Sequence, residues 1–213
     1  KDGWTLEITE YADYVVPNNV VEDGEMDANY FQHVPYLETF NAENGTHLVS
    51  VAMIHYEPFG IYAGTKSAIA DLAEGDKIAI PNDGSNRARA LLLLEQEGII
   101  KLKEGVGMDA TDLDIVENKL NLDIVQMEAA QIANVRDSVA LAVINGNYAI
   151  LGGLKVKDAL AAESADSIAA TFSWKAPFTR AAKESSRASS RYRRLVIPSL
   201  TRVSNAEILS SSL

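Results

Sequence analysis

An apolar strand, a polar loop and the start of a helix follow one another in Ile78-Ala79-Ile80-Pro81-Asn82-Asp83-Gly84-Ser85-Asn86-Arg87-Ala88-Arg89-Ala90-Leu91. The backbone N–H groups at the start of such a helix, together with the helix dipole, form a site for an anion. An arginine in the first turns can add a two-pronged clamp on a carboxylate. Spacing alone leaves two interpretations open. One is a ligand site at the carboxyl end of the strand, where α/β proteins bind their ligands. The other is a helix capped by Ser85 or Asn86, with exposed arginines. The loop has neither P-loop spacing nor a G-x-G-x-x-G motif.

Strand and helix patterns alternate on both sides of this segment, between residues 4 and 173. Strands are expected at residues 4–9, 26–31, 48–54, 77–81, 122–127 and 139–144, the first of them half-buried because apolar and polar residues alternate in it. Helices are expected from Pro17, from Val34 to Asn44 and from Arg87 to Gln96. This alternation predicts an α/β fold with a largely parallel sheet.

The composition is that of an ordinary globular protein. The 213 residues are 47% hydrophobic and 23% charged, with a formal net charge of −11 and no cysteine. The length fits one large domain or two small lobes around a shared cleft. No apolar run of about 18 residues is present, so we expect no membrane-spanning helix, and the first residues do not have the pattern of a signal peptide. Disulfides and thiolate metal sites are excluded.

Charge is unevenly distributed along the chain. Residues 1–173 carry 11 basic and 28 acidic side chains, whereas residues 174–213 carry eight and two. The acidic body argues against nucleic acid as a partner, because phosphate binding needs a basic face. Residues 180–194 are rich in Arg and Ser and lack a clear apolar face. That pattern fits a solvated helix, disorder, a nucleic-acid-binding arm or a shifted reading frame. Within this tail, only residues 195–198 resemble core sequence.

Two further segments carry side chains suited to a ligand. Aromatic residues and a histidine gather in Tyr30-Phe31-Gln32-His33-Val34-Pro35-Tyr36, where a strand turns into a helix. These residues can form the apolar wall of a pocket that also presents a polar group, or an ordinary core with a hydrogen-bonded histidine. Asn145-Gly146-Asn147-Tyr148 follows an apolar strand. Its asparagines can bind a ligand's amino or carboxylate group, or cap the next helix.

No set of residues has the spacing of an active site or a metal site. His33, His47 and His55 lack the i, i+4 spacing of a helical metal pair, and there is neither a G-x-S-x-G motif nor a cysteine nucleophile. The acidic segment 109–114 lacks the glycine and the final glutamate of a calcium loop, and is expected to start a helix instead. We therefore expect a protein that is not an enzyme and that uses no cofactor or metal.

Six segments of the chain occur in an order that matches one protein family. They are Glu10-Tyr11-Ala12-Asp13-Tyr14-Val15-Val16-Pro17-Asn18, Asp27-Ala28-Asn29-Tyr30-Phe31-Gln32-His33-Val34-Pro35-Tyr36-Leu37, His55-Tyr56-Glu57-Pro58, residues 81–95, Asp114-Ile115-Val116-Glu117-Asn118 and Val143-Ile144-Asn145-Gly146-Asn147-Tyr148-Ala149. Together they resemble the methionine-binding lipoproteins of bacterial ABC importers (the NlpA/MetQ family). The resemblance covers about residues 4–160.

The resemblance implies a two-lobed fold of the periplasmic-binding-protein type II kind, with mixed, mostly parallel sheets. Residues 1–58 and 171–213 would form lobe one, residues 59–170 would form lobe two, and methionine would bind in the cleft between them. Arg89 would pair with the ligand carboxylate, and Asn86 and Asn145 would contact its backbone groups. The side chain of the ligand would be surrounded by Tyr14, Phe31, His33 and Tyr36. A methionine-containing dipeptide, another apolar amino acid and a surface-adhesin role are the alternatives.

The same resemblance implies the partners and the location. The protein would deliver L-methionine, or a related amino acid, to a membrane permease and its ATPase, and it would act as a monomer without nucleic acid. It would lie outside the cytoplasm, held at the membrane by an N-terminal lipid anchor that these 213 residues do not include.

The chain departs from the family pattern at three places. The first strand and helix that the family pattern leads us to expect, with a P-H-A-E-I-L-like motif, are not among these 213 residues, and Ser204-Asn205-Ala206-Glu207-Ile208-Leu209 resembles that motif only faintly. A ligand-contacting asparagine of the family corresponds to Thr171 or Trp174. After Phe172 only the closing motif Tyr192-Arg193-Arg194-Leu195-Val196-Ile197-Pro198 returns to the pattern.

Overall fold

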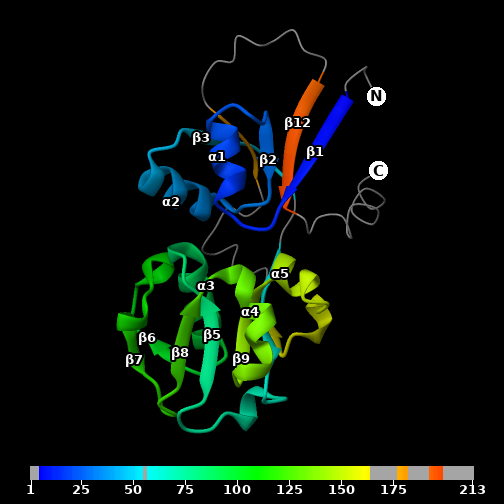
Figure 1. Ribbon diagram of the computed structural model, residues 1–213. Coiled ribbons are helices and arrows are strands. Elements are labelled where there is room, and N and C mark those ends of the chain that lie inside the picture. The colour runs from blue at the N-terminus through cyan, green and yellow to red at the C-terminus, as the bar shows by residue number, and fades with distance from the viewer. Residues whose placement is uncertain (1–4, 55–56, 164–176, 182–191, 199–213) are drawn as a thin grey trace. The chain divides into compact units, whose positions relative to one another are not determined.

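The computed structural model describes residues 5–54, 57–163, 177–181 and 192–198 (Figure 1). The chain divides into two compact units. Unit 1 comprises residues 1–56 and 174–213, and unit 2 comprises residues 57–173. The lobe boundaries implied by the family resemblance, at 58/59 and 170/171, stay a prediction. Both units combine a sheet with helices, as expected of an α/β fold.

Unit 2 contains a five-stranded sheet with the strand order β10-β4-β9-β5-β8. Strand β5 pairs in parallel with β8 and β9, whereas β4 pairs antiparallel with β9 and β10, so the sheet is mixed. Sequence analysis missed β4, in which Phe59 and Ile61 are fully buried. The strands of this sheet are β4 (Phe59–Ala63), β5 (Lys77–Pro81), β8 (Asp123–Met127), β9 (Leu141–Asn145) and β10 (Ala161–Ala162).

Helix α3 (Gly84–Gln96) packs against this sheet and contributes much of the core of unit 2. Leu91 and Leu94 of α3 are fully buried, as are Ile78 and Ile80 of β5. At about 1.5–3 kcal/mol for each buried aliphatic side chain, such contacts are the main source of stability. The other helices are α4 (Ala129–Val135) and α5 (Gly146–Leu151), and the short strands β6 (Lys101–Leu102) and β7 (Ile115–Glu117) pair with each other.

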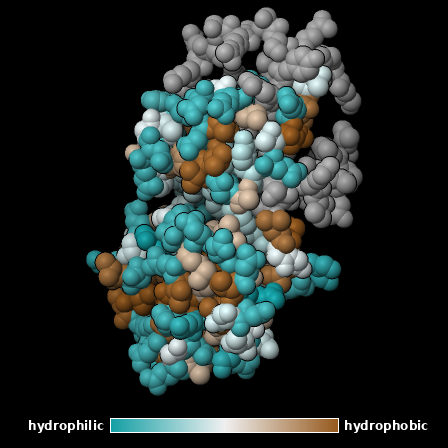
Figure 2. Space-filling model, viewed as in Figure 1, coloured by the Kyte–Doolittle hydropathy of each residue, from teal (hydrophilic) through white to brown (hydrophobic). Residues whose placement is uncertain are grey.

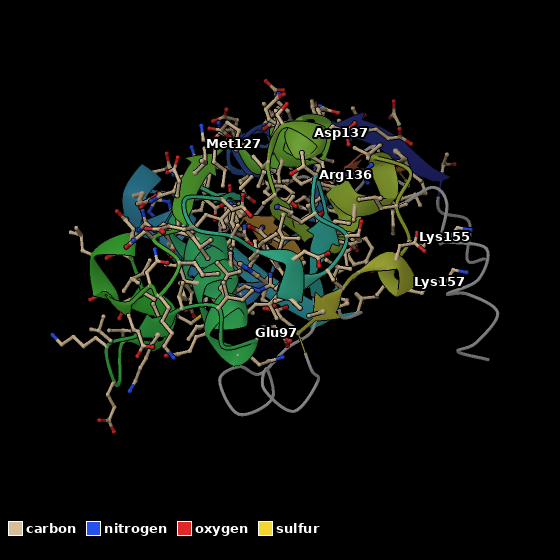
Figure 3. The ribbon with its side chains drawn as sticks, turned by 90° about the horizontal axis from the view of Figure 1, so that it is seen from below. Glu97, Met127, Arg136, Asp137, Lys155 and Lys157 are labelled. Atoms are coloured by element: carbon tan, nitrogen blue, oxygen red, sulfur yellow. The ribbon has the colours of Figure 1, made fainter. Side chains whose placement is uncertain are left out.

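One-turn 3-10 helices connect these elements. The segment 109–114, expected to start a helix, instead contributes to two of them, and Thr111 caps the second through Asp114. Arg136 and Asp137 follow α4 directly and form an ion pair of 3.7 Å, in which Asp137 is exposed and Arg136 is half-buried (Figure 3). The 3-10 turns are η1 (Ile69–Asp71), η2 (Gly107–Asp109), η3 (Asp112–Asp114), η4 (Arg136–Ser138) and η5 (Val156–Asp158).

Unit 1 contains a second five-stranded sheet, with the order β1-β12-β2-β11-β3. The last described strand, β12, lies between β1 and β2 and is parallel to both (Figure 1). The helices of unit 1 are α1 (Val16–Glu22) and α2 (Val34–Asn44). The strands are β1 (Thr5–Tyr11), β2 (Ala28–Tyr30), β3 (Leu48–Met53), β11 (Pro177–Ala181) and β12 (Tyr192–Pro198).

Two sequence predictions for unit 1 are wrong. Residues 180–181 and 192–194 of the Arg/Ser-rich tract lie in strands, because pairing with distant strands sets their conformation whatever their composition. Strand β1 is mostly exposed rather than half-buried, with Leu6 56% and Ile8 50% exposed.

On the face shown in Figure 2, polar residues predominate and apolar residues gather in patches between them. Among the residues that the structure describes, no helix is long and apolar enough to cross a membrane.

Candidate functional site

The loop before α3 is organised by Asp83. Its carboxylate accepts a hydrogen bond from the backbone N–H of Asn86 (3.0 Å) and from the Asn86 amide, at 3.0 and 3.1 Å to its two oxygens. The helix therefore starts at Gly84, and the expected caps, Ser85 and Asn86, are wrong by two or three residues. Because Asp83 supplies a carboxylate to this helix N-terminus, the chain itself meets the preference of the helix dipole for an anion.

Arg89, one turn further along α3, is only 4% exposed, so the interpretation with exposed arginines is wrong for it. Its Nε and Nη2 donate to the two carboxylate oxygens of Glu163, at 3.0 and 2.7 Å. Nη2 also donates to the Glu57 carbonyl and Nη1 to Asn86 Oδ1, both at 3.3 Å. The Cζ atom lies 4.4 Å from the ring centroid of Phe59. The two-pronged carboxylate clamp predicted for Arg89 is thus present, but the carboxylate belongs to the protein.

Asn145, at the end of β9, joins the same network. Its Nδ2 donates to Asn86 Oδ1 at 3.1 Å. It occupies the N-cap position of α5, yet its side chain makes no capping hydrogen bond, so the capping interpretation is wrong. Its Oδ1 is a buried acceptor without a hydrogen-bond partner among the described residues. A buried acceptor of this kind is costly unless a donor reaches it, which suits a ligand ammonium group. We call Asn86, Arg89, Asn145 and Glu163 the polar cluster.

The predicted aromatic residues meet in unit 1. Tyr14 stacks on Phe31 with ring centroids 5.6 Å apart, and Tyr36 meets Tyr14 edge-on at 5.8 Å. Tyr36 also lies 6.2 Å from Phe31 and from His33, and its hydroxyl donates to the Tyr14 carbonyl at 3.1 Å. We call Tyr14, Phe31, His33 and Tyr36 the aromatic cluster.

His33 also has a structural role, as the N-cap residue of α2. It is 7% exposed, and its Nδ1 accepts a hydrogen bond of 3.0 Å from the backbone N–H of Tyr36, which caps α2. A neutral ring with Nδ1 as acceptor is required for this bond. The two interpretations of His33, a pocket wall and a hydrogen-bonded core residue, are therefore compatible.

Sequence analysis missed a network of buried amides behind the aromatic cluster. Asn18 and Gln32 exchange two hydrogen bonds, of 2.9 and 2.7 Å. Asn29 donates to Asn18 Oδ1 and to the Pro17 carbonyl, both at 2.9 Å. Gln32 belongs to this network, whereas its neighbours Phe31 and His33 belong to the aromatic cluster. The network and the aromatic cluster are therefore joined through adjacent residues of the chain.

Sequence analysis also missed Glu163, Phe59 and Glu57, which hold Arg89. No local signal could have identified Glu163, because it is 74 residues from Arg89 in the chain. The expected ligand contact at Thr171 or Trp174, and the matching residues His55 and Tyr56, lie outside the described residues.

The two clusters offer different chemistry. The polar cluster has a guanidinium paired with a carboxylate and two amides, one of which carries the buried acceptor; these groups suit the carboxylate and ammonium of an amino acid. The aromatic cluster has the ring edges and faces that favour a thioether. In the described part of the chain, no three His, Asp or Glu side chains are grouped as metal ligands.

Comparison with known proteins identifies similar sequences and structures. The family model described as NlpA lipoprotein matches residues 1–192. The chain is 44% identical over 170 residues to the D-methionine-binding lipoprotein MetQ of Salmonella typhimurium, covering 78% of this chain and 63% of that protein. It is 45% identical over 159 residues to the membrane lipoprotein TpN32 of Treponema pallidum, covering 74% and 59%. The chain thus spans about three-fifths of the length of these curated relatives.

Two solved structures are similar along most of the chain. The first is a nutrient binding protein from Burkholderia cenocepacia bound to methionine, with a TM-score of 0.81 and 41% identity, covering 88% of this chain and 78% of that one. The second is the substrate binding protein of a methionine transporter from Streptococcus pneumoniae, with a TM-score of 0.75 and 35% identity, covering 80% and 67%. At 35–41% identity, the chain is similar to these two proteins in sequence as well as in fold.

Proposed function

The chain belongs to the NlpA lipoprotein family, and from this membership we propose that it is the substrate-binding component of an ABC importer that binds methionine. It would bind and deliver its ligand without transforming it chemically. The observation that carries the proposal is the similarity, at 41% identity and a TM-score of 0.81, to a binding protein with methionine bound. The polar and aromatic clusters supply side chains that agree with this ligand.

In unit 2, the polar cluster would bind the groups that all amino acids share. The guanidinium of Arg89 would donate a hydrogen bond to the ligand carboxylate, with Asn86 beside it. Asn145 Oδ1 would accept a hydrogen bond from the ligand ammonium, which would supply the donor that this buried oxygen lacks among the described residues.

In unit 1, the aromatic cluster would contact the methionine side chain. The centroids of its contacting rings lie 5.6 to 6.2 Å apart. Sulfur contacts with aromatic rings contribute about 0.3–1.5 kcal/mol each. A thioether should therefore bind more tightly than a hydrocarbon chain of the same length.

A membrane permease and its ATPase would be the protein partners, and the protein would act as a monomer outside the cytoplasm. Attachment to the membrane would be through an N-terminal lipid. The name shared by its family, lipoprotein, supports this location.

Calorimetry with the purified protein tests the proposal. We expect micromolar or tighter binding of L- or D-methionine and weaker binding of norleucine, which replaces the sulfur by a methylene group. Native mass spectrometry would also reveal a ligand retained through purification. If neither methionine isomer binds, and a dipeptide or another apolar amino acid does, the proposed ligand is wrong.

Asn145→Ala supplies the test of the binding mode. The substitution removes Oδ1 together with the Nδ2 that donates to Asn86. Methionine binding should weaken at least tenfold, and unchanged affinity would contradict the role of Asn145. Arg89→Ala should abolish binding, but it also leaves the buried carboxylate of Glu163 without the guanidinium. Because breaking a buried ion pair costs about 3–5 kcal/mol, this variant is informative only if circular dichroism shows that it is folded. Micromolar binding by a folded Arg89→Ala protein would refute the assignment.

A further inference from the structure

We propose that Glu163 is a positioning and specificity-determining residue for ligand binding: it fixes the guanidinium of Arg89 and balances its charge, so that the site selects zwitterionic amino acids over simple carboxylates. This inference rests on the proposed function, because it concerns the same polar cluster.

Glu163 is itself rigidly held. Its backbone N–H donates to the Phe59 carbonyl at 3.0 Å, next to the pairing of β10 with β4. Its Oε2 accepts a hydrogen bond of 2.9 Å from the Phe59 N–H. Main chain and side chain are therefore both tied to Phe59. A carboxylate anchored in this way is a permanent counter-ion of Arg89, not a placeholder that the ligand displaces.

This anchored carboxylate determines the orientation of the guanidinium. Glu163 bonds the edge that carries Nε and Nη2, and the ring of Phe59 lies against the guanidinium carbon at 4.4 Å. Nη1 is consequently directed to Asn86 Oδ1, the same oxygen that receives the Asn145 amide. The groups assigned to the ligand carboxylate and to the ligand ammonium are thus held in a fixed relation before any ligand arrives.

The pair also sets the charge of the site. The side chains of Arg89 and Glu163 are 5% and 9% exposed, so little water screens them. Their charges cancel, and no net positive charge remains to attract an anion. A zwitterion, whose own charges cancel, fits this balance, whereas a carboxylate without an ammonium would add an uncompensated negative charge.

Glu163→Gln removes the negative charge and keeps the shape of the side chain. The experiment measures the dissociation constants of methionine and of its analogue without the amino group, 4-(methylthio)butanoate. We expect the wild type to prefer methionine strongly, and we expect Glu163→Gln to reduce this preference at least about tenfold. Glu163→Asp, which keeps the charge, should retain the preference while binding both ligands more weakly. The matched control is Glu104→Gln, which removes one charge from an exposed position of the same unit and should leave the preference unchanged.

The outcomes separate this inference from the proposed function. If the wild type binds no methionine, the proposed function fails. If the wild type binds methionine and Glu163→Gln keeps the full preference, the role of Glu163 is refuted while the function stands. If Glu163→Gln binds both ligands more tightly by the same factor, the Glu163 carboxylate is a group that the ligand displaces, and the proposed role of Glu163 is also refuted.

A measurement on the unaltered protein covers the case in which Glu163→Gln does not fold. The Nε–H of Arg89, assigned with Arg89→Lys, should give a slowly exchanging NMR signal in the absence of ligand, because Glu163 already holds it. Rapid exchange in the ligand-free protein would contradict the positioning role.

Discussion

The buried amides of unit 1 allow a sharp test of how the aromatic cluster is supported. Asn18 is fully buried, and its side chain takes part in three hydrogen bonds, two with Gln32 and one with Asn29. Asn18→Ala removes all three. At about 1 kcal/mol for each buried hydrogen bond, the expected loss is about 3 kcal/mol of unfolding free energy.

The neighbouring residue Asn19 provides a matched control. It lies in the same helix, is exposed, and its side chain makes none of the hydrogen bonds of the network. Alanine favours a helix over asparagine by up to about 0.7 kcal/mol, and this gain applies to both substitutions. The difference between Asn18→Ala and Asn19→Ala therefore isolates the buried network.

The assay is urea unfolding followed by far-ultraviolet circular dichroism, which reports on the helices and strands of the protein. With a slope of about 2 kcal/mol per molar urea, a loss of about 3 kcal/mol lowers the midpoint by about 1.5 M. Equal midpoints for the two variants would refute the claim that the amides stabilise unit 1.

Three further predictions follow from other parts of the chain. His33→Asn keeps a capping acceptor for α2 but removes the ring, so methionine affinity measured by calorimetry should fall at least tenfold while the thermal midpoint changes little; the reverse pattern would make His33 a core residue only. The pKa of Asp114 is lowered, mainly by the hydrogen bond from the Thr111 hydroxyl and then by the one from the Thr111 backbone N–H. The ionised carboxylate should therefore stabilise η3 at a pH above the unfolded-state pKa of Asp114. This stabilisation should be lost as the pH falls through the folded-state pKa. In an NMR titration, Thr111→Val should raise the pKa of Asp114 toward its ordinary value and Thr111→Ser should not; a pKa unmoved by valine would exclude the hydroxyl as the cause. A Cβ at Gly64 would lie under 3.0 Å from three backbone carbonyl oxygens, whereas a Cβ at Gly84 would meet nothing within 4 Å. Gly64→Ala should therefore destabilise unit 2 by about 3 kcal/mol, and Gly84→Ala should not. Thermal denaturation followed by circular dichroism measures the difference, and equal melting temperatures for the two variants would contradict it.

Local rules were sufficient for the segment around α3. An apolar strand, a polar loop and a helix closed by glycine follow from propensities that act over a few residues, and Gly98 has the left-handed φ of 68° expected of a helix terminator. The start of α3 was misplaced by three residues, because Asp83, Ser85 and Asn86 are all acceptable caps. Only the hydrogen bond from the Asn86 N–H to Asp83 distinguishes them.

Features that depend on distant partners were beyond sequence analysis. Strand β12 lies inside its sheet, between β1 and β2, because residues at opposite ends of the chain pair, such as Ile8 with Leu195. The burial of Arg89 depends on Glu163, 74 residues away. Arginine in a polar loop is ordinarily exposed, so composition favoured the wrong environment for Arg89, whose role in ligand binding stays a prediction.

The predicted ligand residues are divided between the units by chemical type, and this division has a consequence for selectivity. Asn86, Arg89 and Asn145 all belong to unit 2, whereas Tyr14, Phe31, His33 and Tyr36 all belong to unit 1. The first set can distinguish a zwitterion from other small molecules but cannot distinguish one amino acid from another, because every amino acid carries the same backbone groups. The second set can distinguish side chains but has no charge with which to hold a carboxylate. Substitutions in unit 2 should therefore change the affinity for methionine and norleucine by the same factor, while substitutions in the aromatic cluster should change their ratio. Binding of the backbone groups that all amino acids share and selectivity among side chains can then evolve separately, because they depend on different units.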